Sequence, residues 1–177
     1  MHKKLNFTLP KFMIPIFRTN HAGETGAIFI YKGILLVSRD KNIIDFSKKH
    51  LSTESKHLQL IESILHKKDR SKLTILWKFA GFLTGLIPAL LGKKFVYATI
   101  FYVESFVERH YQDQIDLLAG NKKFKSLSIF IKNLQDDEVD HKDEALIKTN
   151  EVKFIHALWG GIVSRGSSFA VKISKLI

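Results

Sequence analysis

The sequence of 177 residues contains no cysteine, which excludes disulfides, iron–sulfur clusters and cysteine-ligated zinc. Any bound metal must therefore be held by histidine nitrogens and carboxylate oxygens, a donor set that suits iron, manganese or zinc. Proline is also scarce, with only three residues, at positions 10, 15 and 88. Because there is little strand-like alternation between turn signals, the pattern favours an all-α protein.

Long uncharged runs are absent as well. The longest, from Phe79 to Gly92, has 14 residues, fewer than the ~20 that a membrane-spanning helix needs. We therefore expect no spanning segment, although such a run can lie in the membrane interface. The first residues, MHKKLNFTLPKFMIPIF, are basic and apolar without a small-residue cleavage site, so we expect no secretory signal and a location on the cytoplasmic side.

Acidic residues are fewer than basic ones, 17 against 28, which gives a formal net charge of +11. Such a surface attracts polyanions, either nucleic acid or an anionic membrane. With 45% hydrophobic residues the chain is long enough to bury a core. We expect one domain over residues 1–177, in which residues 1–17 form a basic and apolar N-terminal segment.

Turn and breaker signals divide the chain into six expected helices. A basic break at 67–72 ends the second, and Ala-Gly-Asn at 119–121 ends the fourth. The expected ranges are 19–38, 42–66, 73–91, 94–118, 125–148 and a last amphipathic helix from 152 onward, interrupted by glycines. The spacing of Gly81 and Gly85 indicates close helix packing or a bend.

Two short motifs carry candidate chemistry, ESKH from Glu54 to His57 and EVDH from Glu138 to His141. Positions i and i+3 of a helix share a face, so the Glu and His of each pair can point at one spot. With 17 acidic residues and eight histidines, however, such pairs also arise by chance on solvated helix faces. The surroundings must decide between the two interpretations.

Two isolated glutamates complete the pattern. Glu24 stands among small and apolar residues, and the nine residues before Glu104 carry no charge. A carboxylate on an apolar face is costly unless it is paired or bound to a metal. Ferritin-like carboxylate bundles hold two metals with a lone Glu on each of two helices and Glu-x-x-His on each of the other two. Each half of this chain supplies one of each, in the same order, as an internal repeat would.

The sequence around these residues resembles the demethoxyubiquinone hydroxylases, the di-iron monooxygenases of ubiquinone biosynthesis. The similar blocks are RTNHAGETGAIFIYKG at 18–33, ESKH, WKFAGFLTGLIPALLGKK at 77–94, VESFVERHYQDQI at 103–115 and DEVDHKDEA at 137–145. They follow one another in that family's order and cover nearly the whole chain from residue 18. The resemblance implies a ferritin-like four-helix di-iron bundle with additional membrane-facing apolar and amphipathic helices.

The resemblance also implies a set of iron ligands, two of which, Glu54 and Glu138, would bridge the metals. The full set is Glu24, Glu54, His57, Glu104, Glu138 and His141. Ser105 and Phe101 depart from the family pattern, because relatives often have Glu there, but neither is among the six.

Several neighbours of these residues are further candidates. Asp137 is placed to bind His57 across the bundle, whereas the matching position in the first half is Thr53, so His141 needs another partner. Tyr31 and Tyr111 each follow a lone Glu by seven residues, and we interpret them as packed core residues, with a redox or substrate role as the alternative. His110 is a candidate neighbour of the site. Histidines expected at surface or packing positions are His2, His50, His66 and His156.

By this resemblance, the protein hydroxylates the ring of a polyprenylated demethoxyubiquinol with dioxygen, two iron ions and NADH as the reductant. No G-x-G-x-x-G motif is present, so a nicotinamide would bind without a Rossmann domain. The expected partners are the polyprenyl benzoquinol, dioxygen, an anionic membrane surface and accessory proteins of ubiquinone biosynthesis, but not nucleic acid. The expected location is peripheral, on the cytoplasmic face of the cell membrane or the matrix face of an inner membrane.

We expect the quinol to enter between residues 73–103 and the C-terminal helix. The basic residues expected to face the membrane are Lys3, Lys4, Lys11, Lys93, Lys94, Arg165, Lys172 and Lys175. Three alternatives stay open: a membrane quinol oxidase with the same ligands, a ferritin-like ferroxidase, and a helical protein that binds nucleic acid.

Overall fold

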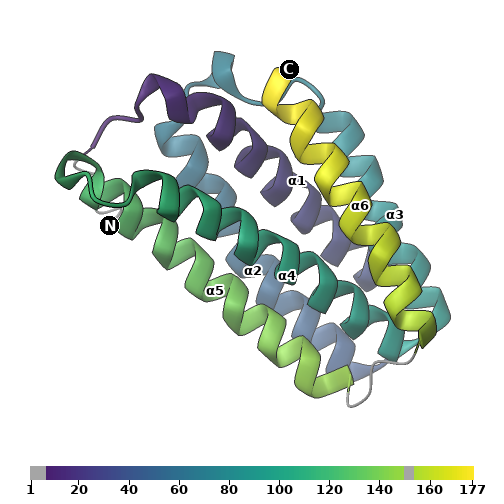
Figure 1. The fold of residues 1–177 in the computed structure, drawn as a ribbon. Helices are drawn as coiled ribbons and strands as arrows, with labels where there is room; N and C mark the ends of the chain where they lie inside the picture. The colour runs from purple at the N-terminus through teal and green to yellow at the C-terminus, as the bar shows by residue number, and fades with distance from the viewer. Residues whose placement is uncertain (1–6, 150–153) are drawn as a thin grey trace.

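The computed structural model describes residues 7–149 and 154–177, and every regular element within these ranges is helical. The α-helices are α1 (Ile14–Val37), α2 (Lys41–Ile64), α3 (Thr74–Leu91), α4 (Lys93–Leu118), α5 (Lys125–Thr149) and α6 (Phe154–Leu176) (Figure 1). Short 3-10 helices are η1 (Lys11–Met13), η2 (Lys67–Asp69) and η3 (Lys122–Phe124). The all-α prediction is confirmed.

Helix α1 differs most from its predicted range, because it begins at Ile14 rather than at 19. Pro15 lies in its first turn, where a missing backbone N–H breaks no intrahelical hydrogen bond. Met13 and Phe17 are fully buried in the core, so these residues of the expected N-terminal segment pack within the fold. Residues 1–6, with Lys3 and Lys4, lie outside the described residues. Helix α6 continues through the glycines that were expected to interrupt it.

Four of the helices form a bundle, in which α1 packs against α2 and α4 packs against α5. Helices α3 and α6 lie along the side of the bundle formed by α1 and α4 (Figure 1). The apolar core has two clusters. One includes Tyr31, Phe46 and Ile100, and the other includes Phe17 and Ile131. In each bundle helix, the residues between the two clusters are those that carry the predicted ligands.

Glycines allow α1 and α3 to touch along their backbones. A Cβ atom on Gly81 would lie 2.2 Å from the carbonyl oxygen of Gly26, and one on Gly85 would lie 1.9 Å from that of Ile30. From the other side, a Cβ atom on Gly33 would lie 2.2 Å from the carbonyl oxygen of Phe82. Because no side chain fits at these distances, the glycines are required for the contact. Of the two interpretations of the Gly81/Gly85 spacing, close packing is confirmed.

Within residues 7–149 and 154–177, α3 is the single helix whose length and composition would let it cross a membrane. It has 18 residues and a mean hydropathy of 1.6, and 22% of it is buried. Because the criterion rests on length and composition alone, the expectation of no spanning segment is untested. That expectation counted uncharged residues only, whereas α3 includes Lys78. A helix that packs along a neighbour, as α3 does on α1, can meet the same criterion.

Candidate metal centre

Four helices bring the six predicted ligand residues together in the middle of the bundle. They are Glu24 on α1, Glu54 and His57 on α2, Glu104 on α4, and Glu138 and His141 on α5. None of the six exposes more than 4% of its surface. Buried carboxylates and imidazoles at this density require compensation by protons, hydrogen bonds or cations.

The ligand atoms form two overlapping groups, and within each group all atoms lie within 4.8 Å of one another. The first group is Glu24, Glu54, His57 and Glu138, and the second is Glu54, Glu104, Glu138 and His141. Glu54 and Glu138 belong to both groups, and each group adds one lone Glu and one His. This is the arrangement that two ions bridged by Glu54 and Glu138 would need. Metal ligation by the six residues stays a prediction.

Several buried atoms of the cluster have no hydrogen bond. They include Oε2 of Glu24, Oε1 of Glu54 and Oε2 of Glu138. Nδ1 of His141 lies 3.0 Å from Glu54 Oε1 and 3.2 Å from Glu138 Oε2, yet it forms a hydrogen bond with neither. A buried polar atom without a partner costs about 1–3 kcal/mol. Ligation of a cation would remove this cost, so the atoms fit a metal site.

The carboxylates of Glu24 and Glu104 are the hardest to ionise. Burial raises the pKa of each well above its ordinary value, and the negative charges of Glu54 and Glu138 raise it further. Four ionised carboxylates carry a charge of −4, which two divalent cations would balance. Both the total charge and the chemical type of the donor atoms therefore fit two divalent ions.

For the imidazoles of His57 and His141, the neighbouring charges favour the ionised form and burial opposes it. Burial alone would lower the pKa of His57 and His141, but the neighbouring carboxylates outweigh it and raise both pKa values to about 10. For Glu138, burial alone would raise the pKa, but the neighbouring imidazoles of His141 and His57 lower it to about 2. The protein alone thus keeps protons on its imidazoles, and a bound metal would compete with those protons.

His57 is contacted by a carboxylate on each of its ring nitrogens. Nδ1 lies 3.0 Å from Glu138 Oε1, and Nε2 lies 2.9 Å from Oδ2 of Asp137. The predicted contact between Asp137 and His57 is confirmed. His141 has a different neighbour, as expected, because the ring of His50 lies edge-on against it with centroids 4.0 Å apart.

His50 is a neighbour of the cluster that the sequence analysis missed. It is fully buried, and its Nε2 lies 3.1 Å from Oε2 of Glu144. Of the two expected positions, surface or packing, it occupies a packing one, and only its contact with the cluster was not predicted. The available signal was its position seven residues before His57, two turns away on the same helix face.

The two tyrosines reach the cluster in a crossed manner. The hydroxyl of Tyr111 donates to Oε1 of Glu24, and the hydroxyl of Tyr31 lies 3.4 Å from Oε1 of Glu104. Each lone glutamate is thus contacted by the tyrosine that follows the other one. The interpretation as packed core residues with satisfied hydroxyls is confirmed, whereas a redox or substrate role is untested. Ser105 donates to the carbonyl of Phe101 within α4, away from the cluster.

A cavity of about 430 Å³, which we call the central cavity, lies between α1, α3, α4 and α6. Four of the cluster's carboxylates line it, those of Glu24, Glu54, Glu104 and Glu138. Its other walls are mainly apolar, with Leu76, Ala80 and Thr84 from α3 and Trp159, Ile162, Phe169 and Val171 from α6. The cavity therefore lies where the sequence predicted the substrate entrance, between residues 73–103 and the C-terminal helix.

His110 lines the central cavity as a neutral acceptor. Burial lowers its pKa to about 4, so the ring is uncharged at neutral pH. Its Nε2 lies 2.8 Å from the hydroxyl oxygen of Thr19, whose single proton is donated to the carbonyl of Ile16. Nε2 must therefore be the protonated nitrogen, which leaves Nδ1 with a free lone pair.

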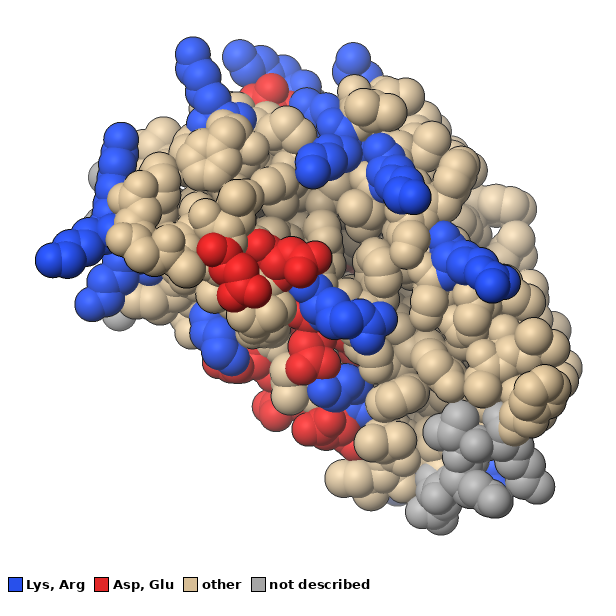
Figure 2. All heavy atoms as spheres, viewed as in Figure 1, with Lys and Arg blue, Asp and Glu red and all other residues tan. Residues whose placement is uncertain are grey.

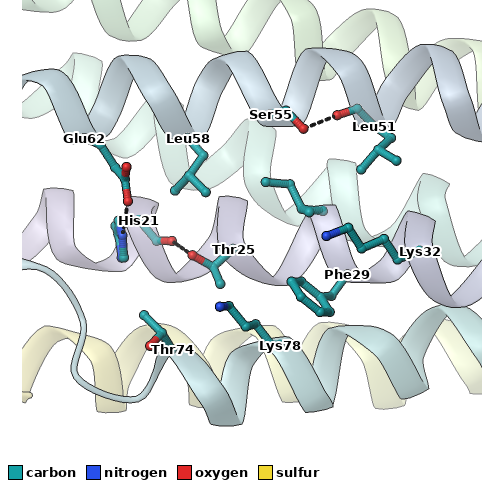
Figure 3. A pocket seen from close by; sticks show the side chains of 11 residues that line it. His21, Thr25, Phe29, Lys32, Leu51, Ser55, Leu58, Glu62, Thr74 and Lys78 are labelled. Carbon is teal, nitrogen blue, oxygen red and sulfur yellow. Dashed lines mark hydrogen bonds and ion pairs between the residues drawn. The ribbon is translucent and has the colours of Figure 1, made fainter.

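A second cavity, of about 450 Å³, lies between α1, α2 and α3 (Figure 3). We call it the lateral cavity. None of the six cluster residues lines it. Lys32 and Lys78 lie beside it, and His21 and Glu62 lie 3.2 Å apart at one end.

Comparison with known proteins gives the family. Residues 11–174 match the family described as ubiquinone biosynthesis protein COQ7. The chain belongs to this family. The resemblance indicated by the sequence motifs is confirmed, and so is the ferritin-like helical bundle that it implies.

Relatives within the COQ7 family bear names that state an activity. The chain is 32% identical over 164 residues to the NADPH-dependent 3-demethoxyubiquinone 3-hydroxylase, mitochondrial, of Mus musculus, covering 90% of this chain and 76% of the mouse protein. It is 28% identical over 164 residues to the 3-demethoxyubiquinol 3-hydroxylase of Rhodospirillum rubrum, with the same coverage. Identity to the 5-demethoxyubiquinone hydroxylase, mitochondrial, of Saccharomyces cerevisiae is 30% over 152 residues, covering 76% of this chain and 65% of the yeast protein.

Proposed function

We propose that this protein is a di-iron monooxygenase that hydroxylates the ring of a polyprenylated demethoxyubiquinol in ubiquinone biosynthesis. The observation that carries the proposal is the pair of overlapping ligand groups that share Glu54 and Glu138 and border the central cavity. A ring in this cavity would lie against the carboxylates, within reach of whatever they bind.

The six cluster residues would hold two iron ions, which when bound supply the activation of dioxygen. In the reaction, a ring C–H bond becomes C–OH, one oxygen atom of dioxygen enters the product and the other leaves as water. The two electrons come from a reduced nicotinamide. Tyr111 and Tyr31 orient the lone glutamates through their hydroxyls. Because the cluster is buried, the protein also excludes bulk water from the reacting atoms.

The central cavity suits a quinol ring with an isoprenoid tail. Its apolar walls match a hydrocarbon, and its polar lining includes Thr19, Asn20 and His110. Nδ1 of His110 is an acceptor for a hydrogen bond from a ring hydroxyl, which would orient the ring. Since the cavity lies between α3 and α6, the tail would leave toward the exposed surfaces of these helices.

Those surfaces support a peripheral membrane location. Large apolar side chains are exposed on α3, where Ile75 is 82% exposed, and on α6, where Phe154 is 83% exposed. Acidic side chains gather over α4 and α5, whereas basic side chains lie along α6 among uncharged residues (Figure 2). Six of the basic residues predicted to face the membrane are described, and all are exposed: Lys11, Lys93, Lys94, Arg165, Lys172 and Lys175. The membrane would be the cytoplasmic face of the cell membrane or the matrix face of an inner membrane.

The reductant is a reduced nicotinamide in this proposal. We expected NADH from the sequence resemblance, whereas the name of the mouse relative states NADPH dependence. Both nucleotides therefore belong in the assay. Accessory proteins of ubiquinone biosynthesis remain part of the proposal, and nucleic acid has no place in it.

The test is a product analysis with labelled dioxygen. Supplied with a reduced nicotinamide, ¹⁸O₂ and a demethoxyquinone, the protein should yield a product that is heavier by one labelled oxygen. Glu24→Ala and His141→Ala should abolish the product while circular dichroism shows intact helices. Ser105→Ala, on the same helix as Glu104 but outside the cluster, should keep it. If dioxygen is consumed but the ring gains no label, the protein is a quinol oxidase or a ferroxidase and the proposal fails.

A further inference from the structure

Two lysines at the lateral cavity form no salt bridge with any residue that the structure describes. Lys32 of α1 and Lys78 of α3 both lie beside it (Figure 3). The salt bridges that lysine and arginine form in the described parts of the chain all involve other residues. The two ammonium groups are therefore free to bind an anion.

One aromatic ring holds these two groups near each other. Nζ of Lys32 lies 4.4 Å from the centroid of the Phe29 ring, and Nζ of Lys78 lies 5.7 Å from the same centroid. Cation–π attraction stabilises both positions. The two ammonium groups nevertheless repel each other. An anion bound between them would attract both and offset this repulsion.

Among the described residues, Glu62 is the one acidic side chain that lines the cavity, and it does not supply this anion. Oε1 of Glu62 lies 2.8 Å from Nη1 of Arg70 and 3.2 Å from Nε2 of His21, so Glu62 is already paired. The net charge that the cavity offers to a ligand is therefore positive and comes from Lys32 and Lys78.

The other residues that line the cavity indicate what kind of molecule carries the anion. The hydroxyls of Thr25 and Ser55 donate to carbonyls of their own helices, at 2.7 Å each, so these groups have no proton left for a ligand. The other wall residues include Ile28, Leu51 and Leu58, which are apolar. The sugars and base of a dinucleotide would find few donors here. The cavity fits an anionic head that carries an apolar body.

Helix α3 joins this cavity to the proposed membrane surface. Lys78 follows Ile75 by three residues and precedes Phe79, and these two apolar side chains are 82% and 62% exposed. On its other flank α3 lines the central cavity. If the apolar face of α3 lies in the membrane interface, Lys78 and Lys32 stand at its edge, where lipid headgroups begin.

We propose that the lateral cavity binds the phosphate headgroup of an anionic phospholipid, through Lys32 and Lys78. This site rests on the membrane location in the proposed function, and it would fix the orientation of the bundle on the membrane surface. Attraction between the net charge of the protein and the membrane would not fix the orientation, because it involves no specific contact.

The test uses short-chain lipids that stay monomeric, so that a site is measured rather than a surface. Calorimetric titration of the full chain with dihexanoylphosphatidylglycerol should give binding about tenfold tighter than with dihexanoylphosphatidylcholine, which has the same tails but no net charge. Glycerol 3-phosphate and NADPH should each bind at least tenfold more weakly than the anionic lipid. If either binds as tightly, the cavity is a site for free phosphate or for a dinucleotide, and the proposal is wrong.

Charge reversal assigns the binding to this cavity. The double variant Lys32→Glu/Lys78→Glu should lose the preference for the anionic lipid, and Lys32→Gln/Lys78→Gln should lose most of it. Lys32, Lys78 and the control residue Lys125 are exposed, so helix content should not change. Lys125→Glu on α5 should keep the preference. An unchanged preference in both double variants overturns the proposal. Because quinone and oxygen are absent from this titration, its outcome is independent of the labelled-oxygen test.

Discussion

Each ring nitrogen of His57 faces a carboxylate, one inside the cluster and one near the surface. Its Nδ1 faces Glu138 and its Nε2 faces Asp137, which is 55% exposed. A carboxylate on the outer nitrogen of a metal-binding imidazole fixes the ring orientation and makes the inner nitrogen a stronger donor. Asp137 would therefore act through His57, not by contact with a metal.

The substitution Asp137→Asn tests this role. The amide keeps the size of the carboxylate but removes its charge, so we expect iron affinity to fall by about 10- to 100-fold. Competition with a chelator measures the affinity. Asp136→Asn is the matched control, because Asp136 is exposed and pairs with Lys132 on its own helix. Equal losses in the two variants would contradict the positioning role.

The sequence was sufficient to predict the six cluster residues and the contact of Asp137 with His57, because these follow from helical spacing and the family motifs. It was not sufficient for the crossed contacts of Tyr31 and Tyr111. Those depend on how far α1 and α4 are shifted along each other, and no spacing within one helix encodes this shift. The contact of His50 with His141 was missed as well, because it crosses from α2 to α5 and His50 lies outside the motifs that marked Asp137 and His57.

Among the elements, α3 depends most on a few small residues. Its Gly85 lies where a Cβ atom would come within 1.9 Å of the carbonyl oxygen of Ile30. We expect Gly85→Ala to destabilise the protein by about 1–3 kcal/mol or more, because the obstacle is backbone, which cannot move aside as a side chain does. Urea unfolding followed by circular dichroism measures the change.

Gly161 of α6 provides the control, because no atom lies within 4 Å of the position of its Cβ atom. There, alanine fits and restricts the unfolded chain, so Gly161→Ala should be neutral or stabilise by up to about 1 kcal/mol. A similar loss of stability in both variants would mean that the contact between α1 and α3 is not the cause.

The helices themselves were largely predictable. Most ends fall within two residues of the expected ranges, because Gly, Asn and charged runs mark them. The start of α1 was predicted too late, since Pro15 reads as a breaker from sequence alone but is tolerated in a first turn. The continuity of α6 through Gly160, Gly161 and Gly166 was missed. A Cβ atom on Gly160 would lie 2.2 Å from the ring of Tyr102, so that glycine serves a helix contact and not a break.

The whole molecule presents an apolar surface on α3 and α6 together with a net charge of +11. We expect it to bind vesicles that contain phosphatidylglycerol more tightly than vesicles of phosphatidylcholine alone. Affinity should fall as salt rises, but release should stay incomplete because apolar side chains are inserted. Reversal of charge at Lys172 and Lys175 should weaken the salt-sensitive part only. Vesicle flotation measures this, and equal binding to both vesicle types would contradict the electrostatic part.

At this scale the sequence predicted the fold class and the side of the bundle where the central cavity lies. It did not predict the lateral cavity, because Lys32 and Lys78 are far apart in sequence and meet only when α3 packs along α1. Surface lysines have no period or spacing that reveals such a meeting.

The central claim is that the buried cluster is one site for two irons, with Glu54 and Glu138 shared between them. Iron content after anaerobic loading with ferrous iron tests it most directly. Wild-type protein should hold two irons per chain, and Glu54→Ala and Glu138→Ala should each lose both, because each residue belongs to both ligand groups. Stoichiometric zinc that iron cannot displace, or two irons retained in both variants, would contradict the account.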